Sequence, residues 1–267
     1  MSPLDLARLE TICSECQVIG SAIRVLQETD STNDRCQELA GDPQLDGLVI
    51  FAEHQTAGRG QRGSIWSAPP GSGLLFSILL HPKGELAQPN FLTAFAALAI
   101  VEQLQESYRL DARIKWPNDV LANGCKTAGI LVERGVATVI GVGLNVSIKR
   151  TEFPANLRMP ATSIEEETGH VVDRTELAGN LLRRLDGIYA EARQFGARHL
   201  WPRWEEYLES FGDGPVVATT RRERIVGRLV GLRPDRGARV ARGDGTLACI
   251  PPEELIRVER DIGGIGD

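Results

Sequence analysis

Residues 52 to 73, AEHQTAGRGQRGSIWSAPPGSG, hold the densest group of side chains and glycines that could handle an anion. The glycines match G-x-G-x-x-G, which binds dinucleotides when it follows a strand and opens a helix. A β-rich run does precede them, but the Pro and Gly residues that follow exclude a helix of useful length. The stretch therefore predicts a loop between two strands. Backbone N–H groups beside Arg59 and Arg62 make this loop a candidate anion site, and a flexible surface loop with solvated arginines is the alternative.

Three further stretches carry polar side chains at predicted strand ends or turns, where functional groups concentrate. They are D-S-T-N at 30–33, K-W-P-N-D at 115–119 and C-K-T-A-G-I-L at 125–131. Their polar groups are hydroxyls, amides, Lys and Arg, and the sequence offers no Ser/His/Asp relay, metal cluster or paired acids of a hydrolase. Such a set suits the binding of a polar, uncharged headgroup and the stabilisation of phosphate charge.

The elements that must position these stretches are short strands and a few helices. Apolar runs predict strands at 22–28, 48–54, 74–80 and 112–117, and helices at 3–17, 33–40, 91–108, 173–196 and 199–208. The Asn123-Gly124 pair is a strong hairpin signal and predicts an antiparallel meander over 119–147. The glycines within this meander indicate close approach by a ligand or another backbone.

A change of composition after Gly212 divides the chain. Short strands spaced by turns follow it, as in a small β-barrel. We therefore predict an α+β domain with a mixed or antiparallel sheet over 1–212, followed by a small β-barrel domain over 213–267.

Charge and composition exclude several classes of protein. The net charge of −6 argues against a general nucleic-acid binder. No apolar run approaches the roughly 18 residues of a membrane span, and charged residues interrupt any signal-peptide core. Five cysteines, an odd number, indicate reduced thiols and a cytoplasmic location. Cys13 and Cys16 form a C-x-x-C, but without a second pair they predict two thiols in a short helix rather than a metal or redox site.

Taken in order, the motifs resemble those of the biotin–protein ligases. The family pattern runs S-T-N, Q-x-A-G-R-G-x-x-G-x-x-W, K-W-P-N-D, K-x-A-G-I-L-x-E and G-x-G-x-N. This chain has Ser31-Thr32-Asn33, QTAGRGQRGSIW, KWPND, KTAGILVE and GVGLN, in that order over about 115 residues. The resemblance covers nearly the whole chain. It implies a catalytic domain related to the class II tRNA synthetases, followed by an SH3-like β-barrel.

The activity implied by the resemblance is ATP-dependent. It forms biotinyl-5′-AMP from biotin and ATP with Mg²⁺, and it then transfers the biotinyl group to a lysine of a biotin carboxyl carrier domain. The resemblance is to the form without an N-terminal DNA-binding domain, because only a short segment precedes the first predicted strand. Neither nucleic acid nor membrane is expected as a partner, and a homodimer is compatible with the family.

The resemblance also assigns roles to residues. Arg59 and Lys126 are the candidate catalytic cations. The implied biotin-binding residues are Ser31, Thr32, Asn33, Gln55, Arg59, Gly60, Gln61, Lys126 and Gly129. The implied ATP-binding residues are Arg62, Trp66, Lys115, Asn118 and Asn145. Asp119 is the candidate metal ligand, or it positions Lys126. Trp66 could equally be a core residue, and Asp119 an ordinary turn residue.

Two positions depart from the family pattern, which often has Arg where this chain has Gln61 and Ser64. We hypothesise that the missing cation loosens retention of the adenylate or slows its formation, and that Arg62 partly compensates. Gln61→Arg is then expected to slow release of the adenylate into solvent, and an unchanged release rate would contradict this.

Two alternative functions remain open. Lipoate–protein ligases share the fold and the adenylate chemistry, although their loop pattern, close to R-R-x-S-G-G-G, is absent. The second alternative function is that of a non-catalytic biotin-binding protein, and the presence of both candidate cations argues against it.

Overall fold

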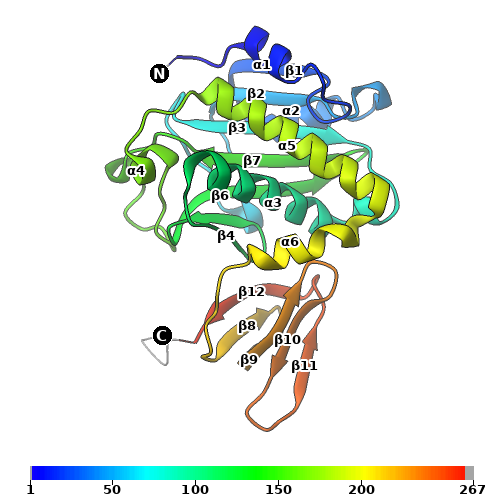
Figure 1. The fold of residues 1–267 in the computed structure, drawn as a ribbon, viewed down its shortest axis with the longest axis vertical. Coiled ribbons are helices and arrows are strands. Elements are labelled where there is room, and N and C mark those ends of the chain that lie inside the picture. The colour runs from blue at the N-terminus through cyan, green and yellow to red at the C-terminus, as the bar shows by residue number, and fades with distance from the viewer. Residues whose placement is uncertain (1, 262–267) are drawn as a thin grey trace.

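The computed structural model describes residues 2–261 and shows two β-sheets (Figure 1). The strands of the first sheet are β1 (Ile23–Thr29), β2 (Val49–Gln55), β3 (Gly73–Leu80), β4 (Ala112–Lys115), β5 (Asp119–Ala122), β6 (Cys125–Arg134) and β7 (Thr138–Asn145). Those of the second are β8 (Val216–Thr220), β9 (Arg224–Arg233), β10 (Gly237–Ala241), β11 (Leu247–Ile250) and β12 (Leu255–Arg260). The α-helices are α1 (Leu6–Ile12), α2 (Thr32–Glu38), α3 (Pro89–Tyr108), α4 (Ile164–Thr168), α5 (Arg174–Phe195) and α6 (Trp201–Glu206).

The first sheet has the strand order β1-β2-β3-β7-β6-β5-β4 and is mixed. Only β1 and β2 pair in parallel, and α2 provides the crossover that a parallel pair requires. The pair Asn123-Gly124 joins β5 to β6 with φ values of 50° and 80°, as expected for the tight hairpin turn that this sequence favours. The predicted meander is thus confirmed.

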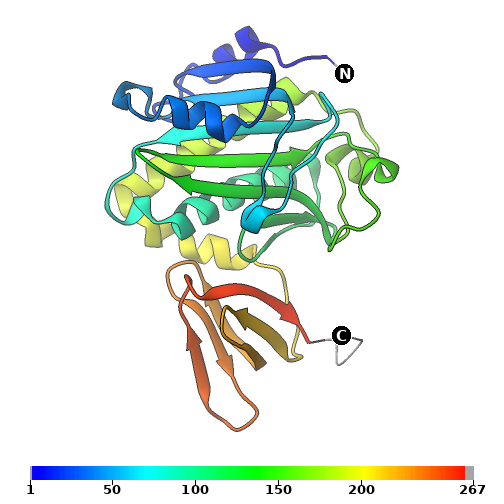
Figure 2. The ribbon, with the colours of Figure 1, turned by 180° about the vertical axis from the view of Figure 1, so that it is seen from behind.

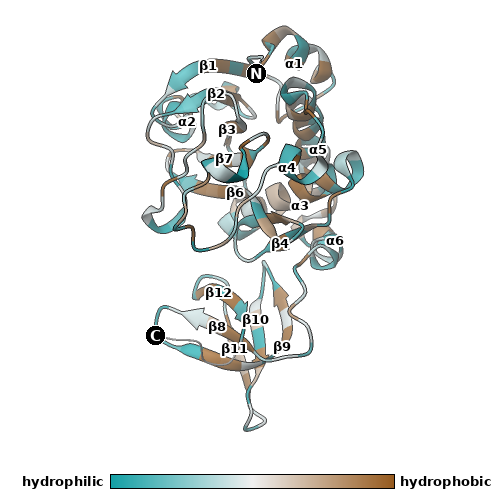
Figure 3. Ribbon diagram, turned by 90° about the vertical axis from the view of Figure 1, so that its left-hand side faces the viewer, coloured by the Kyte–Doolittle hydropathy of each residue, from teal (hydrophilic) through white to brown (hydrophobic). Residues whose placement is uncertain are grey.

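The two faces of this sheet are covered differently, because successive side chains of a strand point to opposite sides. On β3, Leu74, Phe76 and Ile78 belong to the main core, which also contains the buried sides of α3 and α5. Leu79 packs instead in a smaller cluster with Cys36 of α2. Seen from the side, α3 and α5 form a layer against one face (Figure 3). The other face carries α2 and the loop between β2 and β3 (Figure 2).

The second sheet is antiparallel with the order β11-β10-β9-β8-β12. The segment before it joins the edge of the first sheet. Ile114 of β4 donates its N–H to the carbonyl of Tyr207 at 2.7 Å and accepts from the N–H of Glu209 at 2.9 Å. The expected fold class, a mixed sheet followed by a small β domain, is therefore confirmed. The division at residues 212 and 213 remains a prediction, and its last residues lie outside those described.

One local prediction was wrong, and one strand was missed. The helix expected over residues 3–17 ends at Ile12, because the chain turns at Cys13 and the N–H of Cys16 bonds the carbonyl of Cys13 at 2.9 Å. β12 was not predicted, since its charged residues interrupt the alternation of apolar and polar residues that indicates a strand.

Ser31 occupies the N-cap position of α2, but its side chain makes no capping hydrogen bond. In the described part of the chain, no helix combines the length and apolarity needed to cross a membrane.

Candidate functional site

Glycines on β6 and β7 form the floor of the candidate site, on the face opposite α3 and α5. The register places Gly143 of β7 beside Gly129 of β6. A Cβ at Gly143 would lie 2.2 Å from the Trp66 ring, and one at Gly141 would lie 2.3 Å from Oδ1 of Asn33. These positions therefore require glycine, because side chains from other elements lie directly on the backbone of the sheet.

A hydrogen-bond network above this floor joins α2 to two strands. Gln55 Oε1, at the end of β2, accepts from the backbone N–H of Thr32 at 2.7 Å and from its hydroxyl at 3.0 Å. Ser77 Oγ of β3 donates to Asn33 Oδ1 at 2.5 Å and lies 2.7 Å from Thr32 Oγ1. Ser31, Thr32 and Asn33 are all buried. The structure thus brings together four of the residues predicted to bind biotin.

Arg59 extends this network from the loop between β2 and β3. Its guanidinium donates to both carboxylate oxygens of Asp34, at 2.6 and 2.7 Å, and to Glu133 Oε2 at 3.2 Å. Glu133 Oε2 also accepts from Asn33 Nδ2 at 2.7 Å. The hydrogen bond from Arg59 is the main reason why the pKa of Asp34 lies below its usual range. The same bond is the main factor that raises the pKa of Arg59.

Lys126 lies at the other end of the glycine floor. Its Nζ is 2.6 Å from Asp119 Oδ1 and 5.5 Å from the centroid of the Trp66 ring. A Cβ at Gly129 would lie 2.9 Å from Trp66 and 3.5 Å from Lys126 Nζ. Both predicted catalytic cations are therefore on the same face of the sheet, and each is paired with a carboxylate.

The other predicted ATP-binding side chains bond to the protein itself. Lys115 Nζ lies 3.2 Å from a carboxylate oxygen of Glu209, whose pKa is raised chiefly by burial. Asn118 Nδ2 donates to a carbonyl of β6 at 2.9 Å, and Asn145 Nδ2 donates to the carbonyl of residue 162 at 3.0 Å. In the described state, these groups position β4, β5 and β7 relative to their neighbours.

The loop itself is closed by its own backbone. Gly60 N–H donates to the carbonyl of Ser64 at 2.7 Å, and Trp66 N–H donates to that of Gly58 at 3.0 Å. A Cβ at Gly58 would lie 2.4 Å from the Trp66 carbonyl. The loop therefore has a defined backbone conformation, which favours the anion site over the flexible loop weighed from the sequence.

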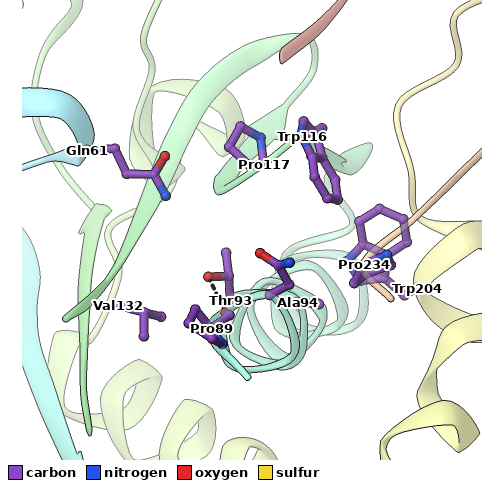
Figure 4. Close-up of a pocket in the computed structure, with 10 residues that line it drawn as sticks. Gln61, Pro89, Thr93, Ala94, Trp116, Pro117, Val132, Trp204 and Pro234 are labelled. Atoms are coloured by element: carbon purple, nitrogen blue, oxygen red, sulfur yellow. Dashed lines mark hydrogen bonds between the residues drawn. The ribbon is translucent and has the colours of Figure 1, made fainter. Parts of the chain in front are cut away.

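Two loop residues point away from the glycine floor. Gln61 lines a cavity of about 100 Å³ with residues of α3, with Pro117, and with Pro234 in the turn between β9 and β10 (Figure 4). Arg62 Nη2 donates to the carbonyl of Ile256 in β12 at 3.0 Å. The loop that begins beside the network thus reaches the second sheet.

The sequence did not single out Ser77, Asp34 or Glu133. Ser77 had a visible signal, because it is the one polar residue within the apolar run LLFSILL. Glu133 also had one, because it is the acidic residue that closes the motif KTAGILVE. Asp34 had none, since it reads as a residue of the first helical turn. Within residues 2–261, no group of three His, Cys, Asp or Glu side chains could hold a metal ion.

Comparisons with known proteins point to one kind of enzyme. Residues 25–147 match the model of the biotin/lipoate A/B protein ligase family. The chain is 34% identical to the biotin–acetyl-CoA-carboxylase ligase of Paracoccus denitrificans, over 86% of this chain and 98% of that protein. It is 32% identical to the bifunctional ligase/repressor BirA of Bacillus subtilis, over 81% of this chain and 68% of that protein. The biotin protein ligase of Aquifex aeolicus, solved with biotin and ATP, superimposes with a TM-score of 0.79 at 29% identity, covering 90% of this chain and 100% of that one.

Proposed function

Because this chain belongs to the biotin–protein ligase family, we propose that it activates biotin with ATP to biotinyl-5′-AMP and transfers the biotinyl group to a lysine of a carboxyl carrier domain. The observation that carries the proposal is the network from Gln55 through Thr32, Ser77 and Asn33 to Glu133 and Arg59. The network places hydrogen-bonding groups that suit a neutral headgroup next to a cation that suits a phosphate.

In the first step, a carboxylate oxygen of biotin attacks the α-phosphorus of ATP, and pyrophosphate leaves. The carboxylate is already ionised at neutral pH, so the step needs no general base. It needs positive charge around a transition state whose negative charge spreads over the phosphoryl oxygens. Arg59 and Lys126 supply this charge from the two ends of the glycine floor.

The ureido ring of biotin is neutral and must leave water to bind. A buried polar group without a partner costs about 1–3 kcal/mol, so the ring needs a complementary donor and acceptor. The buried side chains of Ser31 and Thr32 and the partly buried side chain of Gln55 offer both kinds of group. The apolar remainder of the ligand and the flat adenine ring are suited to the glycine floor and to Trp66.

The described residues contain no cluster of side chains that could hold a magnesium ion by themselves. Asp119 is a poor ligand for a resident ion, because its Oδ1 already lies 2.6 Å from Lys126 Nζ. Mg²⁺ commonly keeps several waters and binds through substrate phosphates. We therefore assign Mg²⁺ to the ATP that enters, and no protein side chain is needed to retain it.

In the second step, the ε-amine of the carrier lysine attacks the carbonyl carbon of the adenylate, and AMP leaves. The names of the Paracoccus relative and of its homologues support a carboxylase carrier as the acceptor. We place the reaction in the cytoplasm, where thiols stay reduced, since all five cysteines are free.

The test is ATP–pyrophosphate exchange by the purified protein with biotin, with lipoate or with neither. Exchange that depends on biotin alone is the expected result. Exchange with lipoate alone would favour a lipoate ligase, and absence of exchange with either would leave only ligand binding. Mass spectrometry of a carboxyl carrier domain incubated with protein, ATP and biotin then tests the transfer.

A further inference from the structure

Asp34 pairs with Arg59, one of the two predicted catalytic cations. It lies in the first turn of α2, next to the predicted biotin-binding residues, and its carboxylate takes both terminal nitrogens of Arg59 at 2.6 and 2.7 Å. The nearest competing cation, Arg35, is bonded to Asp30 at 3.1 Å and to Glu38 at 2.9 Å. Asp34 is therefore committed to Arg59.

The geometry of the pair fixes the plane of the guanidinium. A bidentate Arg–carboxylate pair sets orientation as well as position, whereas a single contact does not. Arg59 comes from a loop and its side chain is partly exposed, at 39%. Without a partner, such a side chain samples many rotamers. The contact with Glu133 is single and longer, at 3.2 Å, so it holds the guanidinium less firmly.

Part of the guanidinium remains available to a ligand. Asp34 occupies one edge, formed by Nη1 and Nη2. Among residues 2–261, no acceptor is bonded to Nε of Arg59, which lies away from that edge. An anion can therefore approach Nε and replace the weaker Glu133 contact while the Asp34 pair stays intact.

We propose that Asp34 is a positioning residue, which holds Arg59 oriented for the phosphoryl group during adenylate formation. This inference rests on the proposed function. The negative charge of Asp34 repels the phosphates of ATP. The Asp34–Arg59 pair therefore favours the reaction only if the orientation of Arg59 contributes more than this repulsion costs. The proposal thus requires that removal of the Asp34 charge slows the reaction.

The experiment measures biotin-dependent ATP–pyrophosphate exchange for the full chain and for Asp34→Asn, Arg59→Ala and the double variant. Glu38→Gln is the matched control, because it removes a carboxylate of the same helix that pairs with Arg35 and not with Arg59. We expect Asp34→Asn to lower kcat by about 10- to 100-fold, the scale for a misplaced catalytic group. Within the Arg59→Ala background, the same change is expected to have no further effect.

Each outcome is decisive. A kcat for Asp34→Asn at or above that of the unchanged protein, or losses that multiply in the double variant, would overturn the positioning role. Biotin-dependent exchange by the unchanged protein separates these results from failure of the proposed function, which would show as no exchange at all. Thermal unfolding checks that each variant folds. Asp34→Ser gives a second variant that must show the same coupling to Arg59.

Discussion

At the scale of single residues, Ser77 links the two halves of the polar network. It is fully buried in β3, and its hydroxyl is within hydrogen-bond distance of both Thr32 and Asn33. A buried polar group left without a partner costs about 1–3 kcal/mol. Ser77 therefore stabilises the protein and also aligns two side chains of the proposed biotin site.

Ser77→Ala is expected to lower the free energy of unfolding by about 1–2 kcal/mol, because Asn33 Oδ1 loses its donor. It is also expected to raise the KM for biotin, since Thr32 and Asn33 lose their alignment. Urea denaturation and the exchange assay measure the two effects. Ser14→Ala, at an exposed position just after α1, is the control. A loss of stability with an unchanged KM would show that Ser77 is only structural.

Asp34 makes stability depend on pH. Its pKa is lowered in the folded protein, mainly by the hydrogen bond from Arg59. A carboxylate of this kind stabilises the fold above its unfolded pKa, about 3.9, and loses that contribution as the pH falls through the lower folded pKa. The Tm difference between the protein and Asp34→Asn is thus expected to be largest near neutral pH and to shrink below about pH 4. A difference that stays constant across a pH series of thermal melts would contradict the ion pair.

At the scale of elements, the site depends on which face of each strand carries glycine. The inward residues of β7, such as Ile140 and Val142, are bulky and belong to the main core. The alternate residues Gly141 and Gly143 face the site, where Asn33 and Trp66 contact the backbone. One strand therefore supplies core packing on one side and, on the other, a flat surface that Asn33 and Trp66 contact.

Gly143→Ala is expected to displace Trp66, because the added Cβ would lie 2.2 Å from its ring. Loss of the flat surface should weaken binding of both ATP and biotin, which calorimetry measures. Gly231→Ala is the matched control, because this glycine also lies in a strand and a Cβ there meets nothing within 4 Å. Unchanged affinities for Gly143→Ala would show that the glycine floor is not part of the binding site.

At the scale of the whole molecule, the segment before β8 and the site loop connect the second sheet to the site. The segment before β8 pairs with Ile114 at the edge of the first sheet, and its Glu209 holds Lys115. Arg62 connects the site loop to Ile256 of β12. Arg62 has a φ of 57°, in the left-handed region that side chains other than glycine rarely adopt, so the tertiary contact helps to maintain this conformation.

Arg62→Ala is expected to raise the KM for ATP several-fold with little change in Tm, because the loop loses its contact with β12 while the core stays intact. The exchange assay and thermal unfolding measure these effects. Arg239→Ala, an exposed arginine on β10, is the control for loss of charge. An equal rise of the KM in both variants would attribute the effect to charge rather than to the contact.

The sequence by itself determined the fold class, the hairpins and the motif residues, because turns and strand alternation depend on residues within a few positions of one another. It also indicated the polar chemistry of the site and the small β domain. β12 was missed because charged residues interrupt its apolar pattern, and α1 was predicted too long because only the apolar content of the segment was considered.

Only the tertiary structure decided how the cations are held. Arg59 pairs with Asp34 across 25 positions of the chain and with Glu133 across 74, and Asn33 bonds Glu133 across 100. Such contacts depend on strand register and on how closely α2 and the loop approach the sheet, which no local pattern encodes. A one-residue shift of β6 would turn Glu133 away from Arg59. For this reason the candidate cations were predictable from the sequence, whereas the pairing of Arg59 with Asp34 and Glu133 was not.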